Sequence, residues 1–177
     1  MCPITIPQGR AIAIAWPRTV DGHAKSAAYY RIGKDGAEKE TMDMDQNTVL
    51  VVDDEEDIRQ SLQFLLADEG YDIVMACDGK EALDVIPLLP KPAVILLDLQ
   101  MPRLDGCGVL LDLSKHPEKR DQYAIFLLTA NIGLLSPDMV RMLGSEGIPV
   151  LSKPFDIDQL TAQVYSAFVR LEEQHRP

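Results

Sequence analysis

Short apolar runs alternate with amphipathic stretches of helical length from Thr48 onward. Five of these runs are rich in aliphatic and β-branched residues and predict strands; they cover residues 49–52, 71–75, 93–97, 124–128 and 148–151. The stretches between and after them carry apolar residues at helical spacing, as Ile58, Leu62 and Leu66 do, which indicates helices with one buried face. Because parallel strands need crossovers that cover both sides of a sheet, the alternation predicts an α/β fold: a doubly wound five-stranded parallel sheet with helices on both faces.

Single residues predict where several of these helices begin and end. Gly70 follows the first helical stretch and favours its end. Asp78 is placed to cap the second helix. Ser136, followed by Pro137, is typical of a cap and first turn, and predicts a helix that starts there.

Residues 1–47 lack this organisation. Prolines interrupt the start, and a polar, charged run occupies residues 33–47. The alternation of Ile12, Ile14 and Trp16 is compatible with one edge strand. We therefore expect a flexible N-terminal extension over 1–47, a folded domain over 48–173 and a short C-terminal tail over 174–177.

Net charge narrows the possible partners. The 177 residues include 28 acidic and 17 basic side chains, for a formal net charge of −11. Residues 1–47 contain six of each sign, so residues 48–177 carry the whole acidic surplus. Affinity for DNA or RNA comes largely from clustered lysine and arginine. The surplus argues against direct contact with nucleic acid.

Nothing in the sequence indicates export or membrane insertion. The longest apolar run near the start, residues 11–16, is too short to span a bilayer and lacks the flanks of a signal peptide. Cys2, Cys77 and Cys107 are odd in number and form no CxxC pair, which argues against a disulfide framework or a zinc site. We expect a cytoplasmic protein.

Polar side chains follow four of the predicted strands. Asp53 and Asp54 come after the first strand, Asp98 after the third, Thr129 after the fourth and Lys153 after the fifth. Because the carboxyl ends of parallel strands meet at one edge of a sheet, these side chains are expected to gather there. Three crowded carboxylates repel one another unless a cation neutralises them, and oxygen ligands of this kind suit Mg²⁺.

Such a cluster supports phosphoryl chemistry. A carboxylate attacks phosphorus when a metal and a cation shield the phosphoryl oxygens. Asp98 is best placed to attack, with Asp53 and Asp54 on the metal, Lys153 paired with the phosphoryl group and the Thr129 hydroxyl bonded to one of its oxygens. The alternative is that strand-end aspartates only cap the helices that follow, which is common for any one of them.

Four stretches resemble the signature blocks of the CheY-like receiver domain of bacterial response regulators. They are VLVVDDEEDIR at 49–59, VILLDLQMPRLDG at 94–106, LLTA at 127–130 and LSKPF at 151–155. The resemblance spans residues 48 to about 172. It implies the flavodoxin-like strand order 2-1-3-4-5, an order for which the chemotaxis protein CheY is a standard example.

The resemblance also implies a role for each acidic residue of the cluster. Asp98 would be the phosphoacceptor, taking a phosphoryl group from a phosphohistidine on a sensor histidine kinase or a histidine phosphotransfer protein. Asp54 and Asp98 would ligate Mg²⁺ directly with the backbone carbonyl of Gln100, and Asp53 would help through water. The protein would then act as a switch, not as an enzyme.

The remaining positions are partly typical of the family. Thr129 would be the switch hydroxyl and Lys153 the family's cation, with a cis bond to Pro154. Many relatives carry an aromatic residue three positions before the lysine, where this chain has Val150. We therefore expect coupling to run mainly through Thr129 and the loop 130–135.

Two amides flank the expected phosphorylation site. Gln100 and Asn131 lie two positions after the phosphoacceptor and the switch threonine, and each can hold a water molecule without deprotonating it. They are predicted to modulate the lifetime of the phosphorylated state, or else are solvated loop residues. Residues 136–173 are the expected signalling face, for a homodimer or for an unidentified downstream protein.

Three functions remain in competition. The favoured one is a single-domain response regulator of a two-component phosphorelay. The second is a docking module that needs no phosphate, against which the intact set of Asp98, Thr129 and Lys153 argues. The third is a Mg²⁺-dependent phosphohydrolase with an aspartyl-phosphate intermediate, and here Gln100 stands where haloacid-dehalogenase-type enzymes carry their second aspartate.

Overall fold

A computed structural model of the chain describes residues 47–89, 92–116 and 122–174 in full. It also describes the backbone of four strands nearer the N-terminus, at 5–6, 10–15, 28–33 and 36–41. Statements about side chains below refer to the first three ranges.

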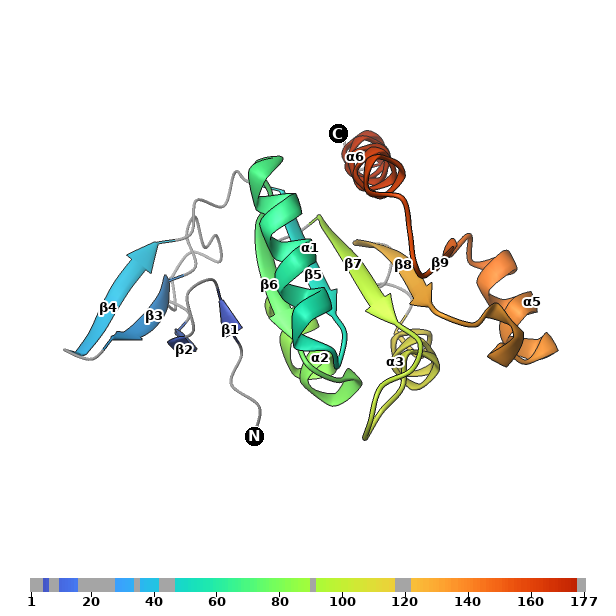
Figure 1. Cartoon of the computed structure of the whole chain (residues 1–177), viewed down its shortest axis with the longest axis horizontal. Helices are drawn as coiled ribbons and strands as arrows, with labels where there is room; N and C mark the ends of the chain where they lie inside the picture. The colour runs from blue at the N-terminus through green and yellow to red at the C-terminus, as the bar shows by residue number, and fades with distance from the viewer. Residues whose placement is uncertain are drawn as a thin grey trace.

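The five expected strands form one parallel sheet (Figure 1). Its order is β6-β5-β7-β8-β9, which confirms the predicted order 2-1-3-4-5. All four neighbouring pairs run parallel. The strands are β5 (Thr48–Val52), β6 (Asp72–Ala76), β7 (Ala93–Asp98), β8 (Tyr123–Thr129) and β9 (Val150–Ser152).

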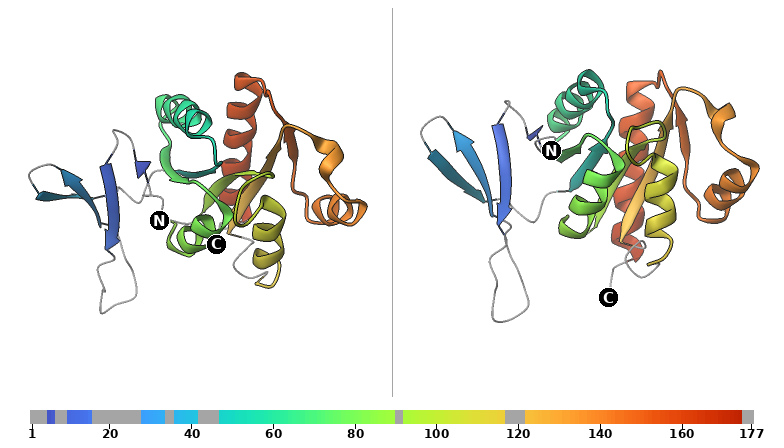
Figure 2. Two further views of the ribbon diagram at one scale, coloured as in Figure 1. Left: turned by 60° about the horizontal axis from the view of Figure 1, so that its bottom comes forward. Right: turned by 90° about the horizontal axis from the view of Figure 1, so that it is seen from below.

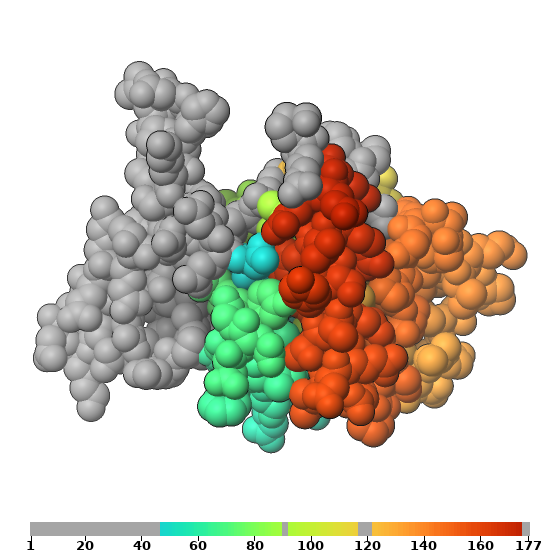
Figure 3. Space-filling model, turned by 90° about the horizontal axis from the view of Figure 1, so that it is seen from above, coloured from blue at the N-terminus to red at the C-terminus, as the bar shows by residue number. Residues whose placement is uncertain are grey.

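Helices cover both faces of this sheet (Figure 2). On one face lie α1 (Glu56–Asp68) and α6 (Ile157–Gln174), which are side by side in Figure 3. On the other lie α2 (Gly79–Val85), α3 (Gly106–Leu113) and α5 (Pro137–Ser145). Two short 3₁₀ helices, η1 (Ile86–Leu88) and η2 (Ile132–Leu134), complete the elements. Within the fully described ranges, no helix has the length and apolar character needed to cross a membrane.

Successive side chains of each strand point to opposite faces of the sheet and so divide the core into two layers. Val49 and Val51 belong to the apolar cluster under α1 and α6, whereas Leu50 and Val52 belong to the cluster under α2, α3 and α5. All four are fully buried. A strand that is covered on both sides reads as a continuous apolar run, which is why these segments stood out in the sequence.

Capping residues act as predicted. The Asp78 side chain accepts a hydrogen bond from the backbone N–H of Glu81 at 2.9 Å and starts α2. The Ser136 hydroxyl accepts from the N–H of Met139 at 3.2 Å and starts α5. Gly70 follows α1 with a φ of +88°, a left-handed conformation that glycine adopts without steric cost.

Two strands begin later than predicted, and for the same reason. Tyr71 donates its N–H back to the carbonyl of Leu66 at 3.1 Å, and Ile148 donates to the carbonyl of Leu143 at 2.9 Å. Each residue follows a glycine of positive φ just past a helix, so its amide closes the helix end. These residues therefore finish helices, and β6 and β9 start one and two residues after them.

Four further strands pair within residues 1–47. They are antiparallel in the order β1-β2-β3-β4 and comprise β1 (Thr5–Ile6), β2 (Arg10–Ala15), β3 (Ala28–Gly33) and β4 (Gly36–Thr41). The edge strand suggested by Ile12 and Ile14 coincides with β2, and Trp16 lies outside the described residues. A flexible extension over 1–47 stays a prediction. At the other end, α6 includes Gln174, and residues 175–177 lie outside the described part.

Two phenylalanines provide a test of the core. Phe168 of α6 is 2% exposed and stacks on Tyr71 at a ring-centroid distance of 5.4 Å, whereas Phe64 of α1 is 80% exposed. Phe168→Ala should lower the free energy of unfolding by about 3–5 kcal/mol, because it leaves a cavity under α6. Phe64→Ala should change it by less than about 0.5 kcal/mol. Urea denaturation measures both, and equal losses would contradict this division of core from surface.

Candidate functional site

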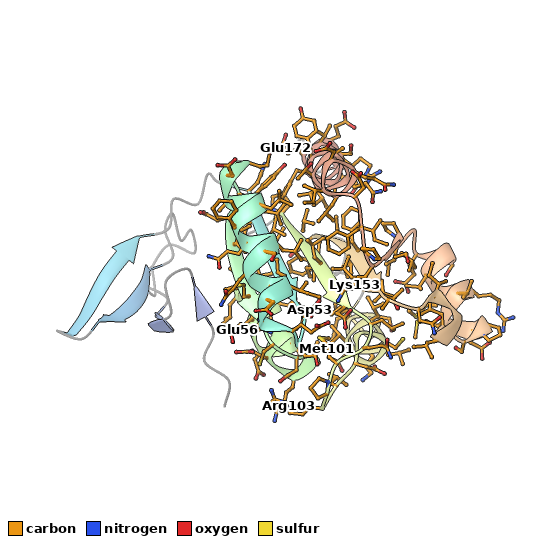
Figure 4. The ribbon with its side chains drawn as sticks, in the orientation of Figure 1. Asp53, Glu56, Met101, Arg103, Lys153 and Glu172 are labelled. Atoms are coloured by element: carbon orange, nitrogen blue, oxygen red, sulfur yellow. The ribbon has the colours of Figure 1, made fainter. Side chains whose placement is uncertain are left out.

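Asp53, Asp98 and Lys153 meet at the carboxyl edge of the sheet. The Lys153 Nζ lies 2.5 Å from Asp53 Oδ2 and 2.7 Å from Asp98 Oδ1. The Asp53 side chain is fully buried, and those of Asp98 and Lys153 are 5% and 13% exposed. Figure 4 shows Asp53 and Lys153 close together between the strand ends. One ammonium therefore serves two carboxylates that are shielded from water.

The sheet places the two carboxylates beside each other. β5 and β7 are neighbours, and the last residue of β5, Val52, pairs with Leu97. Asp53 directly follows Val52, and Asp98 directly follows Leu97, so the two aspartates lie side by side. Lys153 arrives from the far side through β9, and its backbone N–H donates to the carbonyl of Thr129 at 2.7 Å. The bond from Lys153 to the following proline is cis, as predicted.

Thr129 and Asn131 are joined through the backbone. The buried Thr129 Oγ1 accepts a hydrogen bond from the N–H of Asn131 at 3.1 Å. The exposed Asn131 in turn accepts from the N–H of Gly133 through its side-chain Oδ1 at 2.9 Å, which caps η2. The sequence did not predict this capping role.

Gln100 lies on the surface beside the phosphoacceptor candidate. Its backbone N–H donates to Asp98 Oδ2 at 2.9 Å, so both carboxylate oxygens of Asp98 have a partner. The Gln100 residue itself is exposed. The backbone at this position thus helps to hold the Asp98 carboxylate, while the amide side chain is left available to solvent.

The Asp54 side chain is apart from the buried pair. Asp54 is exposed, whereas Asp53 and Asp98 are buried. In the described ranges, no three acidic, histidine or cysteine side chains gather closely enough to hold one metal ion. Asp53 and Asp98 nevertheless offer hard oxygen ligands with a combined charge that one ammonium does not balance, and this donor set fits Mg²⁺.

Burial and ion pairing set the titration of the pair. Burial raises the pKa of the Asp98 carboxyl above 3.8, and repulsion from Asp53 adds to this, against the hydrogen bond and charge of Lys153. Burial would lower the pKa of Lys153, but its two carboxylate partners outweigh burial and raise this pKa above 10.5. Ionisation of Asp98 thus costs native stability as the pH rises above 3.8. Lys153 adds stability that is present below pH 10.5 and lost as the pH rises through its raised pKa.

Arg59 supports the site from α1, and the sequence analysis assigned it no role. This buried arginine donates from Nη1 to the backbone carbonyl of Asp53 at 2.6 Å. Its signal in the sequence was its position three residues before Leu62 and seven before Leu66, on the apolar side of the helix. A charged group on that side is kept only where it is paired or hydrogen-bonded.

Residues 49–165 match the response regulator receiver domain family. The chain belongs to this family. Response regulator MprA of Mycolicibacterium vanbaalenii is 37% identical over 116 residues, which are 66% of this chain and 48% of that protein. A probable transcriptional regulator ycf27 of Cyanophora paradoxa is 37% identical over 132 residues, 74% of this chain and 52% of that one. The chain therefore spans about half the length of these relatives.

Solved receiver domains share the fold. The receiver domain of Francisella response regulator 1452 matches with a TM-score of 0.60 and 33% identity, over 71% of this chain and 98% of that one. Response regulator TrrA of Thermotoga maritima, solved in complex with Mg²⁺ and BeF, matches with a TM-score of 0.56 and 32% identity, over 69% and 99%. These likenesses confirm the CheY-like, flavodoxin-like fold and the family resemblance.

Val150 occupies the position at which many relatives carry an aromatic residue. Val150 opens β9, is half-buried and packs against the apolar cluster under α2, α3 and α5. A β-branched side chain has little freedom at χ1. This position therefore offers no ring that could alternate between a buried and an exposed orientation.

Removing the ammonium tests the electrostatics of the receiver site. Lys153→Met should destabilise the metal-free protein at pH 7 by about 3 kcal/mol, because two buried carboxylates lose their counter-ion. The loss should shrink as the pH falls toward 4, because the variant's carboxylates then bind protons in the native state before the unfolded state does. Urea unfolding in EDTA across this pH range measures both effects.

Lys115→Met is the matched control. Lys115, two residues after α3, forms an ion pair with Asp112 at 2.9 Å, and its side chain is mostly exposed. This substitution should change stability by less than about 0.5 kcal/mol, with no added pH dependence. A loss in Lys153→Met that does not vary with pH would contradict the electrostatic account.

Proposed function

We propose that this receiver domain is a phosphorylation-dependent switch, in which Asp98 accepts a phosphoryl group from a phosphohistidine. The donor would be a sensor histidine kinase or a histidine phosphotransfer protein of a two-component system in the cytoplasm. The observation that carries the proposal is the Lys153 ammonium 2.7 Å from the buried Asp98 carboxylate. Such an ammonium is already in place to receive the charge of an incoming phosphoryl group.

The residues present fit a bound Mg²⁺. Asp53, Asp54 and Asp98, together with the backbone carbonyl of Gln100, would hold it. When bound, Mg²⁺ would neutralise charge on the phosphoryl oxygens. The exposed position of Asp54 is compatible with this set if its side chain turns inward on binding. The Thermotoga relative that was solved with Mg²⁺ and BeF supports the assignment by family likeness.

The chain's own groups then divide the work of transfer. An Asp98 oxygen would attack phosphorus, forming the O–P bond as the N–P bond of the donor breaks and the imidazole departs. Lys153, which is hydrogen-bonded to the Asp98 carboxylate, would then bind a phosphoryl oxygen. The Thr129 hydroxyl accepts from the Asn131 N–H and keeps its own proton to donate to another phosphoryl oxygen.

A groove beside the site suits the phosphodonor. It has a volume of about 580 Å³ and is lined by α1 and by the segment that follows β9, with Lys153 at its edge. Ile58, Leu65 and Phe155 give it a largely apolar lining. An amphipathic helix that carries the donor histidine would fit such a groove with its apolar side inward.

The output is proposed to be a change in protein binding. The signalling face would be residues 136–173, which include α5, β9 and most of α6. Its partner would be a downstream protein or a second copy of this chain. Direct binding of nucleic acid by this domain is not expected, given its acidic surplus.

Labelling with a small phosphodonor tests the proposal. Incubation with acetyl phosphate and Mg²⁺ should add the mass of one phosphoryl group to the protein, and Asp98→Ala should abolish this gain. Asp112→Ala, which removes an exposed aspartate of α3, should be labelled like the wild type. Intact-protein mass spectrometry reads all three.

The labelling result also separates the alternatives. Absence of labelling in the wild type would favour a docking module that needs no phosphate. Rapid consumption of many equivalents of acetyl phosphate would favour a phosphohydrolase. A label that persists in Asp98→Ala would exclude Asp98 as the acceptor.

Gln100 and Asn131 are expected to set the lifetime of the phosphorylated state. Gln100→Ala and Asn131→Ala should still be phosphorylated but should lose the label at altered rates, because an amide beside the phosphoryl group would be able to hold the attacking water. Asn131→Ala also removes the cap of η2, so its effect should be the larger of the two. Decay is followed by mass after the donor is removed, and unchanged rates in both variants would sink the assignment.

A further inference from the structure

The loop that joins β7 to α3 follows Asp98, carries Gln100 and is closed by backbone hydrogen bonds. Leu99 donates its N–H to the carbonyl of Leu128 at 2.8 Å and accepts at its own carbonyl from Gly106 at 3.0 Å. The backbone of the loop is therefore tied both to the sheet and to the first residue of α3.

The same loop is bound to the start of α2. Gly79, the first residue of α2, donates its N–H to the carbonyl of Leu104 at 3.1 Å. A Cβ at Gly79 would lie 2.4 Å from that carbonyl oxygen, and a Cβ at Gly106 would lie 2.4 Å from the carbonyl oxygen of Asp98. Glycine at both positions allows this close approach of backbone to backbone.

Arg103 adds a side-chain contact across the same boundary. Its guanidinium forms an ion pair with the fully buried carboxylate of Asp78, the cap of α2, and donates to the Cys77 Sγ at 3.6 Å. Arg103 has a φ of +67°, a left-handed conformation that arginine rarely adopts. Figure 4 shows Arg103 at the far end of the loop, away from Asp53 and Lys153.

Asp78 uses each of its oxygens for a different purpose. Oδ1 accepts from the N–H of Glu81 and starts α2, whereas Oδ2 faces Arg103. A carboxylate that is shut off from solvent requires such a partner, because an unpaired buried charge is costly. The pair thus connects α2, through Arg103, to the loop that begins at Asp98.

We propose that Arg103 is a positioning residue for the cation site: its ion pair with Asp78 holds the loop 99–105 so that the Gln100 carbonyl and the Asp98 carboxylate face one ion. This inference rests on the proposed function, because it takes Mg²⁺ as the occupant. Arg103 itself contacts Asp78 and Cys77 and is proposed to touch neither the ion nor the phosphoryl group. It would act through the backbone on either side of it, where the N–H of Leu104 donates to the carbonyl of Pro102 at 2.8 Å.

Two measurements on the full chain test the role of Arg103. In metal-free protein, Arg103→Ala should speed amide hydrogen exchange at Gly79, Leu104 and Gly106 while leaving the amides of α6 unchanged. In calorimetric titration with MgCl₂, the same variant should bind Mg²⁺ about tenfold more weakly, the loss typical of removing a group that orients metal ligands. Loss of a positive charge would by itself favour a cation, so weaker binding reports position and not charge.

Two further variants complete the design. Arg103→Lys keeps a cation beside Asp78 and should recover part of the affinity. Lys80→Ala removes an exposed cation of α2 next to the same loop and should bind Mg²⁺ at least as tightly as the wild type. Unchanged exchange or unchanged affinity in Arg103→Ala, or equal loss in Lys80→Ala, would overturn the inference. A wild-type protein that binds no Mg²⁺ would instead overturn the proposed function and this inference with it.

Discussion

The ammonium of Lys153 between the carboxylates of Asp53 and Asp98 is the interaction on which the site depends. Two buried negative charges share one positive charge, so one negative charge stays unbalanced in surroundings where an unpaired charge is unfavourable. Burial raises the pKa of Asp98, and repulsion from Asp53 adds to this, although Lys153 acts in the opposite direction. A hard divalent ion would balance the remaining negative charge. The ion and Lys153 together would then neutralise part of the charge of an incoming phosphoryl group.

From Thr48 onward, periodicity is enough to find the strands and the α-helices, and residues placed directly after buried strands are enough to find the acidic site. Nearer the N-terminus it suggested only β2, and β1, β3 and β4 were missed. The order of the strands came only from the family resemblance, because the alternation of strands and helices along the chain does not determine which strands are neighbours in the sheet. Contacts that depend on side-chain direction were also missed. Neither the role of Arg59 beneath Asp53 nor the cap that Asn131 forms follows from spacing alone. The outward position of Asp54 likewise depends on how the chain turns after β5.

Two arginines support the site from opposite sides. Arg59 holds the carbonyl of Asp53 after β5, and Arg103 joins the loop after β7 to the cap of α2 through Asp78. A left-handed conformation costs a residue with a side chain roughly 1–2 kcal/mol, which the ion pair with a buried carboxylate can offset. Arg59 binds a backbone carbonyl, whereas Arg103 pairs with the side chain of Asp78. The geometry of the carboxylates thus depends on groups that lie outside the site itself.

Under the proposed function, coupling from the site to the surface would have a short route in this chain. Thr129 Oγ1 accepts from the Asn131 N–H, and the Asn131 side chain caps η2, whose Ile132 and Leu134 side chains are largely exposed. If the hydroxyl turned toward a phosphoryl oxygen, the hydrogen bond that it accepts from the Asn131 N–H would shift with it, and the Asn131 side chain that caps η2 would move as well. Val150 has little freedom at χ1 and is not expected to take part. Phosphorylation would then be transmitted as a displacement of two apolar side chains next to the face that begins at α5.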